Sequence, residues 1–231
     1  IKGSGKALGV ASDSGHFLDV LDDGTVMGGP GLDAMPGDRE AFETALRGAG
    51  TTSGKAGWLY YSILETQQQL TRDFATWRVL DHAARTERNP QRRAWFRADL
   101  ARRQAATLQT VGRLSHFVAD GSQPLHMTIH YNGWGDGPNP EGFTRSRIHG
   151  PFEGELVAGS VRLEDVRRRL APPLPPAASL EGQVAAYLRT GWTEVPALYR
   201  LEKAGGLAPG DPRGGDYAAR RLGAGAGALR D

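Results

Sequence analysis

Apolar residues along much of this chain recur with the spacing of amphipathic helices. Between residues 58 and 88 they fall three, four and seven positions apart, and a second run with this spacing extends from about residue 90 to 119. Asn89-Pro90 separates the two runs, and proline suits the first turn of a new helix. The pattern therefore predicts two long consecutive helices.

Shorter helices are predicted on both sides of this pair. The expected spans are residues 38–47, 147–157, 179–203 and 216–222. The first of them carries Asp38 and Glu40 in its opening turn, where negative charge favours a helix N-terminus.

Glycine, proline and polar residues mark the irregular segments. Residues 1–37 and 127–146 are predicted as loops, with a short extended piece at residues 16–20 and a rigid turn at residues 172–176. No strand pattern of any length and no internal repeat is present. We expect an all-α, single-domain multi-helix bundle with long loops over residues 1–231. Both ends resemble interior segments, so we expect the natural chain to extend further.

Composition and charge exclude several classes of protein. The 28 basic and 26 acidic side chains leave a formal net charge of only +2, so no strong overall field directs the chain to nucleic acid or membranes. The absence of cysteine excludes disulfides, thiolate zinc sites and a cysteine nucleophile. No stretch approaches the roughly 20 apolar residues of a transmembrane segment, and no signal segment opens the chain.

Histidine and acidic residues recur in two short segments. His116 and Asp120 are four residues apart near the end of a predicted helix, so their side chains share one face. A turn with glycine and proline follows, and His126 emerges from it. His149 and Glu153 form a second pair with the same spacing. Imidazole nitrogen and carboxylate oxygen are ligands of catalytic zinc, so these five residues together predict a metal centre.

The segment His116-Phe-Val-Ala-Asp120-Gly-Ser-Gln-Pro-Leu-His126 resembles the signature of the zinc-dependent phospholipase C and single-strand-specific nuclease superfamily. That signature is H-x3-D-x5-H, followed downstream by H-x3-[DE], and both halves occur here in order. Upstream, Ser-Gly-His16-Phe-Leu-Asp resembles the family's earlier histidine segment. The resemblance covers roughly residues 16–157. It implies a mostly helical, secreted or periplasmic protein with zinc ions in a cleft, and we expect a monomer.

The resemblance also implies a ligand set. The first zinc would be held by His16, His116 and Asp120, and the second by His126, His149 and Glu153. A third zinc shares the equivalent of Asp120 in the family, but its N-terminal tryptophan and nearby histidine are absent here. The family's upstream aspartate at the first site is also missing, unless Asp13 replaces it. We therefore expect two to three zinc ions.

The chemistry implied by the resemblance is hydrolysis of a phosphate ester. Zinc lowers the pKa of bound water to about 7, so no protein nucleophile is required. Asp120, His116 and Glu153 would be catalytic through the metals they hold. Glu153 in place of aspartate is similar to the phospholipase branch, whereas the 23-residue spacing from His126 to His149 is similar to the nuclease branch.

The substrate therefore stays open between a phospholipid headgroup and single-stranded nucleic acid, with a slight preference for a phospholipase C-like phosphodiesterase. A phosphomonoesterase is a further alternative. Two rivals come from other classes: a metal-binding helical protein without catalysis, and a purely structural helical domain that leaves the matched ligands to coincidence.

Three residues of the 127–146 loop are candidates for substrate binding. His130 could contact phosphate or support a ligand, or be an ordinary loop histidine. Tyr131 and Trp134 could stack on a base or line a headgroup pocket, or pack the loop down. Asp19 could orient a ligand histidine. The arginines near Arg92 could steer an anionic substrate, although a solvated helix face is the favoured interpretation.

Overall fold

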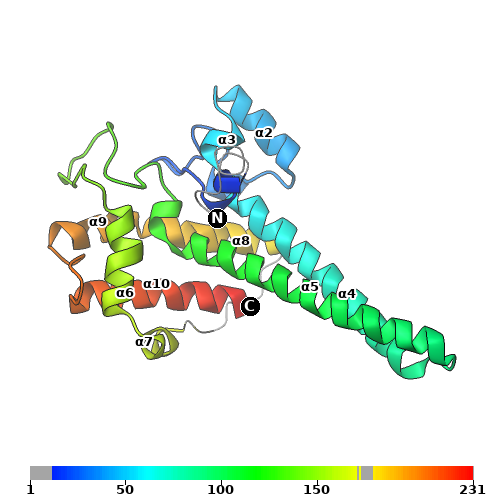
Figure 1. Ribbon diagram of the computed structural model, residues 1–231. Helices are drawn as coiled ribbons and strands as arrows, with labels where there is room; N and C mark the ends of the chain where they lie inside the picture. The colour runs from blue at the N-terminus through cyan, green and yellow to red at the C-terminus, as the bar shows by residue number, and fades with distance from the viewer. Residues whose placement is uncertain (1–11, 171, 173–178, 231) are drawn as a thin grey trace.

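The computed structural model describes residues 12–170, 172 and 179–230 (Figure 1). These residues form a single helical body, and within them no β-strand occurs beyond isolated bridges. The prediction of an all-α protein is confirmed. The first eleven residues, and the predicted turn at residues 172–176 apart from its first residue, lie outside the described part of the chain.

Two long antiparallel helices dominate this body, as the sequence predicts. They are α4 (Leu59–Thr86) and α5 (Pro90–Ser122). The Asn89 side chain caps α5 by accepting hydrogen bonds from the backbone N–H groups of the next helix turn, and Pro90 follows at its start. Figure 1 shows the far end of this hairpin projecting beyond the other helices, with the turn between α4 and α5 at its tip.

The opposite end of the hairpin is covered by C-terminal helices. α8 (Leu180–Thr193) packs against both α4 and α5, and α10 (Pro212–Arg230) packs against α5. The single helix predicted over residues 179–203 is wrong. The structure ends α8 at Thr193 and starts α9 (Val195–Lys203) directly after Glu194. Pro196 explains the break, because proline cannot donate the backbone hydrogen bond that a continuous helix requires there.

Helix α10 is much longer than the predicted span of residues 216–222. Its repeated glycines are buried at Gly223, Gly225 and Gly227. A Cβ atom on Gly225 would lie 3.0 Å from the Ser122 side-chain oxygen at the end of α5. Gly225 thus allows α10 to approach α5 closely, and close packing stabilises a helix that the intrinsic propensity of glycine disfavours.

The N-terminal segment is mostly irregular, as predicted, and lies at the base of the hairpin. It contains the 3₁₀ turns η1 (Asp13–His16) and η2 (Leu32–Ala34). Two short helices follow, α2 (Arg39–Gly48), with Asp38 as its N-cap, and α3 (Ser53–Ala56). Leu18 and Val20 make bridge pairs in the expected extended piece, whereas His16 ends the η1 turn.

Beyond α5 the chain forms the turn η3 (Pro124–His126) and continues as the predicted loop at residues 127–146. The helix expected at residues 147–157 is present, but its central part is the π-helical η4 (Pro151–Leu156), continued by α6 (Val157–Ser160). The short α7 (Leu163–Arg168) was not predicted. None of the helices in the described residues combines the length and apolar character needed to cross a bilayer.

Two hydrophobic clusters form the core, and the segment from Asp120 to Met127 lies between them. The first cluster joins the N-terminal segment, the hairpin base and α8, and it includes Met127. The second joins the long loop with η4, α9 and α10, and it includes Leu125. His126 stands between these two anchored neighbours, so packing on both sides fixes its position.

Candidate metal centre

The six predicted ligands gather into two groups of three. In each group the ligand atoms lie within 4.8 Å of one another, close enough to hold a metal ion. The first group, here the first triad, contains His16, His116 and Asp120, and the second triad contains His126, His149 and Glu153. Among the residues that the structure describes, no third group of this kind occurs.

The first triad joins the end of η1 to the last turns of α5. His16 Nδ1 lies 2.8 Å from Asp120 Oδ2 and 3.1 Å from His116 Nε2. The remaining pair, His116 Nε2 and Asp120 Oδ2, is 3.5 Å apart across one helical turn. His16 is held there because the backbone N–H of Leu18 donates to the His126 carbonyl at 2.8 Å.

The second triad brings η3 against the start of the π-helical segment. His126 Nε2 lies 3.2 Å from His149 Nε2 and 3.6 Å from Glu153 Oε2. His149 Nε2 is 2.6 Å from Glu153 Oε2, and its other ring nitrogen faces the Tyr131 carbonyl at 3.1 Å. The carbonyl contact orients the imidazole so that Nε2 points into the triad. π-Helical turns are frequent at functional sites, and Glu153 lies on this one.

Asp120 connects the two triads. Its Oδ2 atom belongs to the first triad, while Oδ1 lies 3.2 Å from His126 Nδ1. The His16 carbonyl also faces His126 Nδ1, at 2.8 Å. Both acceptors fix the imidazole with Nδ1 as donor, which leaves Nε2 for the second triad. Spacing alone did not predict this link, and a backbone carbonyl that orients a ring leaves no signal in the sequence.

The pKa values of the two carboxyl groups in the site are shifted in the direction that suits a cation, whereas that of His126 favours its protonated form. Burial alone would raise the pKa of Asp120, but hydrogen bonds with His126 and His16 outweigh it and lower that pKa. Hydrogen bonds with His126 and His149 hold the pKa of Glu153 well below its usual range. Burial would lower the pKa of His126, yet its hydrogen bonds with Asp120 and Glu153 raise it to about 9. The carboxylates therefore stay ionised, as metal ligands must be.

Zinc fits the donor sets of both triads. Two imidazoles and one carboxylate are a ligand set of catalytic zinc, and tetrahedral bonds of about 2.05 Å place ligand atoms about 3.3 Å apart. The separations here range from 2.6 Å to 3.6 Å and therefore lie around that value. The side chains of Asp120 and His126 are 10% exposed, whereas those of His116 and Glu153 are 63% and 54% exposed. Each triad thus has a buried side and a side open to solvent.

The three candidate substrate-binding residues of the loop have different environments. His130 is 1% exposed and hydrogen-bonded through both ring nitrogens, to Asp22 and to the backbone N–H of Gly135. Its ring stacks on Trp134 with centroids 3.8 Å apart. Tyr131 is 52% exposed beside His149, so of the three it is the side chain open to a substrate.

Asp19 contacts no histidine through its side chain in the described part of the chain, and its role as an orienting residue has no geometric support. Burial raises the pKa of Asp19 to about 7. It is a desolvated carboxyl group three residues from His16.

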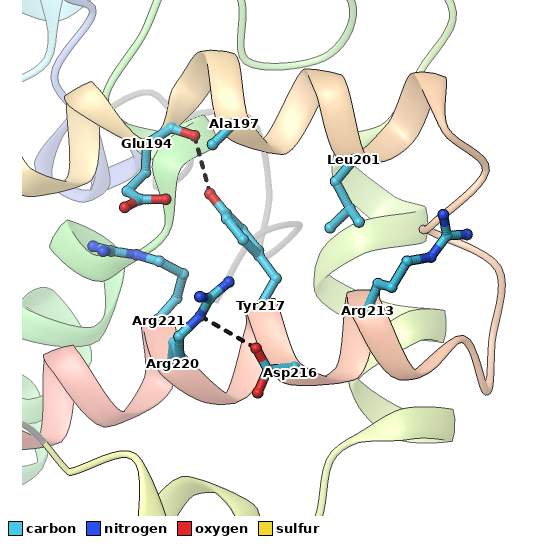
Figure 2. A pocket seen from close by; sticks show the side chains of 8 residues that line it. All are labelled: Glu194, Ala197, Leu201, Arg213, Asp216, Tyr217, Arg220 and Arg221. Atoms are coloured by element: carbon cyan, nitrogen blue, oxygen red, sulfur yellow. Dashed lines mark hydrogen bonds and ion pairs between the residues drawn. The ribbon is translucent and has the colours of Figure 1, made fainter.

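A cavity of about 640 Å³ lies away from both triads, between α9 and α10 (Figure 2). Tyr217 crosses it to donate a hydrogen bond to the Glu194 carbonyl at 3.0 Å. Two of its arginines are paired with carboxylates, Arg213 with Asp211 and Arg220 with Asp216. None of the predicted ligands lines it, so the candidate chemistry lies at the triads.

A comparison of the chain with known protein families, with curated proteins and with solved structures finds no match to any of them. The functional interpretation therefore depends on the geometry of the two triads and on the resemblance carried by their motifs.

Proposed function

We propose that this chain is a zinc-dependent hydrolase of phosphate esters, a phosphodiesterase similar to phospholipase C. The observation that carries the proposal is the pair of adjacent triads, built from the five residues of the motif and His16 and linked by Asp120. A structural ion-pair network accounts less well for the arrangement, because each triad has two histidines facing one carboxylate oxygen and an open side.

Each triad would hold one zinc ion through its three side chains. When bound, zinc polarises a phosphoryl oxygen and lowers the pKa of bound water to about 7. Asp120 and the His16 carbonyl keep His126 Nε2 directed at its ion. The exposed sides of His116 and Glu153 leave access for a phosphate ester, and Tyr131 lies at the edge of that access.

Zinc content and hydrolysis, measured together, test the proposal. Purified protein is expected to bind one zinc per triad and to hydrolyse bis(p-nitrophenyl) phosphate. His126→Ala should lose the second zinc and lower the turnover at least about a hundredfold, because a metal ion contributes several kcal/mol to stabilising the transition state. His82→Ala is the matched control, because His82 is exposed on α4 and lies in neither triad.

The substrate is tested with phosphatidylcholine micelles against single-stranded DNA. Release of phosphocholine supports the phospholipase C-like activity, whereas cleavage of DNA alone assigns the chain to the nuclease alternative. Zinc binding without hydrolysis of any ester would identify a non-catalytic metal-binding protein. Absence of bound zinc from folded protein would overturn the proposal.

A further inference from the structure

The tip of the α4–α5 hairpin carries an unusual concentration of positive charge. We define the tip as residues 85–97, which end α4, form the turn and begin α5. This segment contains five arginines and one acidic residue, Glu87, so its formal charge is +4 against +2 for the whole chain. The arginines are Arg85, Arg88, Arg92, Arg93 and Arg97. The near balance of charge in the complete sequence conceals this local excess.

Part of this charge is available to a partner, although the Arg93 guanidinium donates a hydrogen bond to the Glu87 carbonyl at 3.4 Å. Arg85 pairs with Asp81, and Arg92 pairs with Glu87 at 3.3 Å. Arg88 and Arg97 are exposed, and neither has a carboxylate partner among the described residues. Successive residues of a helix point about 100° apart, so Arg93 and Arg97, four residues apart, share one face of α5, and Arg92 lies beside that face. The arginines of α5 at the tip therefore lie within about 140° of the helix circumference, on one side of the hairpin.

An aromatic side chain is exposed among these arginines. Trp95 is 57% exposed and makes an edge-on contact with Phe96, whose ring centroid is 5.2 Å away. Further along the hairpin, Val79 and Leu108 are 67% and 69% exposed. Exposed tryptophan beside arginine is typical of segments that lie at the boundary between lipid headgroups and acyl chains.

We propose that the hairpin tip binds the surface of an anionic phospholipid bilayer. The arginines would contact lipid phosphates while Trp95 enters the headgroup region. A second copy of the chain is disfavoured because two tips of charge +4 repel each other. A single nucleic-acid strand is bound in a groove with several aromatic side chains for its bases to stack on. The tip is the projecting end of the hairpin and exposes one large aromatic side chain, Trp95, in its described residues, which suits the headgroup region of a bilayer.

This inference depends only on the hairpin, and it holds whether or not the triads bind metal. Arg97 and Asp120 are 23 residues apart on one straight helix, which places the tip about 35 Å from the metal centre. The tip therefore attaches the protein to a surface and does not by itself identify the ester that the metal centre hydrolyses.

Sedimentation of the full chain with vesicles tests the proposal. Binding is expected to mixed phosphatidylglycerol and phosphatidylcholine vesicles, and to weaken with added salt. Arg88→Gln/Arg97→Gln should weaken it roughly 30-fold, because each arginine near an anionic surface contributes about a factor of five. The matched control is Arg147→Gln/Arg162→Gln, which removes the same charge from exposed positions outside the hairpin.

Two substitutions of Trp95 separate insertion from simple charge attraction. Trp95→Ala should weaken vesicle binding by roughly tenfold or more, since a half-exposed tryptophan offers a large apolar area. Trp95→Phe should keep most of the binding but lose the blue shift of tryptophan emission on vesicle addition. Equal binding to pure phosphatidylcholine, no effect of the tip variants beyond that of the control, or binding of single-stranded DNA in place of vesicles would each overturn the proposal.

Discussion

Replacing Asp120 by alanine is expected to weaken both metal sites, although Asp120 would be a direct ligand in only one. In the first triad the substitution removes the oxygen that faces His16 at 2.8 Å and His116 at 3.5 Å. At the second triad it removes the acceptor 3.2 Å from His126 Nδ1, which orients the imidazole. His126 of the second triad would thus lose an orienting hydrogen bond to Asp120, a residue of the first triad.

The expected loss of metal affinity at the second triad follows from the two hydrogen-bond acceptors that face His126 Nδ1. Loss of the group that orients a ligand histidine costs about 10- to 100-fold in metal affinity. The His16 carbonyl, 2.8 Å from the same nitrogen, would remain as a second acceptor. We therefore expect the lower end of that range at the second site, about tenfold or about 1.4 kcal/mol. The first site loses a ligand and should weaken far more.

Competition with a zinc-binding dye can resolve the two affinities, with circular dichroism to verify that the variant is folded. Glu153→Gln is the matched control, because Glu153 belongs to the second triad and makes no contact with the first triad in the described residues. It should weaken only the second site. Unchanged affinity of the second site in Asp120→Ala would refute the role of Asp120 as a link between the triads.

Two further predictions concern stability. Burial raises the pKa of Asp19 to about 7. Below the ordinary pKa of 3.8 the carboxyl group is protonated in both the folded and the unfolded protein and does not change the free energy of unfolding. As the pH rises from 3.8 to 7 the group ionises more readily in the unfolded protein, and the folded protein is progressively destabilised. Asp19→Asn should therefore stabilise the protein at pH 8 by at most about 4 kcal/mol and have no effect at pH 3, as chemical denaturation at both pH values would show. A Cβ atom on Gly191 would lie 2.5 Å from the Gly121 carbonyl oxygen and 3.0 Å from Met127, so Gly191→Ala should cost about 1 to 3 kcal/mol in unfolding free energy. Gly112→Ala, which meets nothing within 4 Å on α5, should instead stabilise by about 1 kcal/mol, and equal effects of the two substitutions would contradict this packing argument.

Local patterns explain why α4 and α5 could be predicted closely. Their apolar spacing is repeated over many turns, and Asn89-Pro90 supplies both a cap and a helix start. The break between α8 and α9 also had a local signal in Pro196. No local signal predicted the full length of α10. Its glycines have a low helix propensity, and the helix forms because close packing against α5 compensates for it.

Some contacts of the candidate site likewise follow from local spacing in the sequence, and others from the packing of distant segments. The sequence by itself determined the two pairs, His116 with Asp120 and His149 with Glu153, because residues four apart meet on one face of a helix. His16 was predicted in the first triad only through the resemblance, and the tertiary structure brings it within 3.1 Å of His116, 100 residues away. Only the tertiary structure decided that Asp120 also supports His126 of the second triad. Those contacts depend on how the N-terminal segment packs against the end of α5, and the packing of distant segments is set by the whole core, which short-range spacing does not encode.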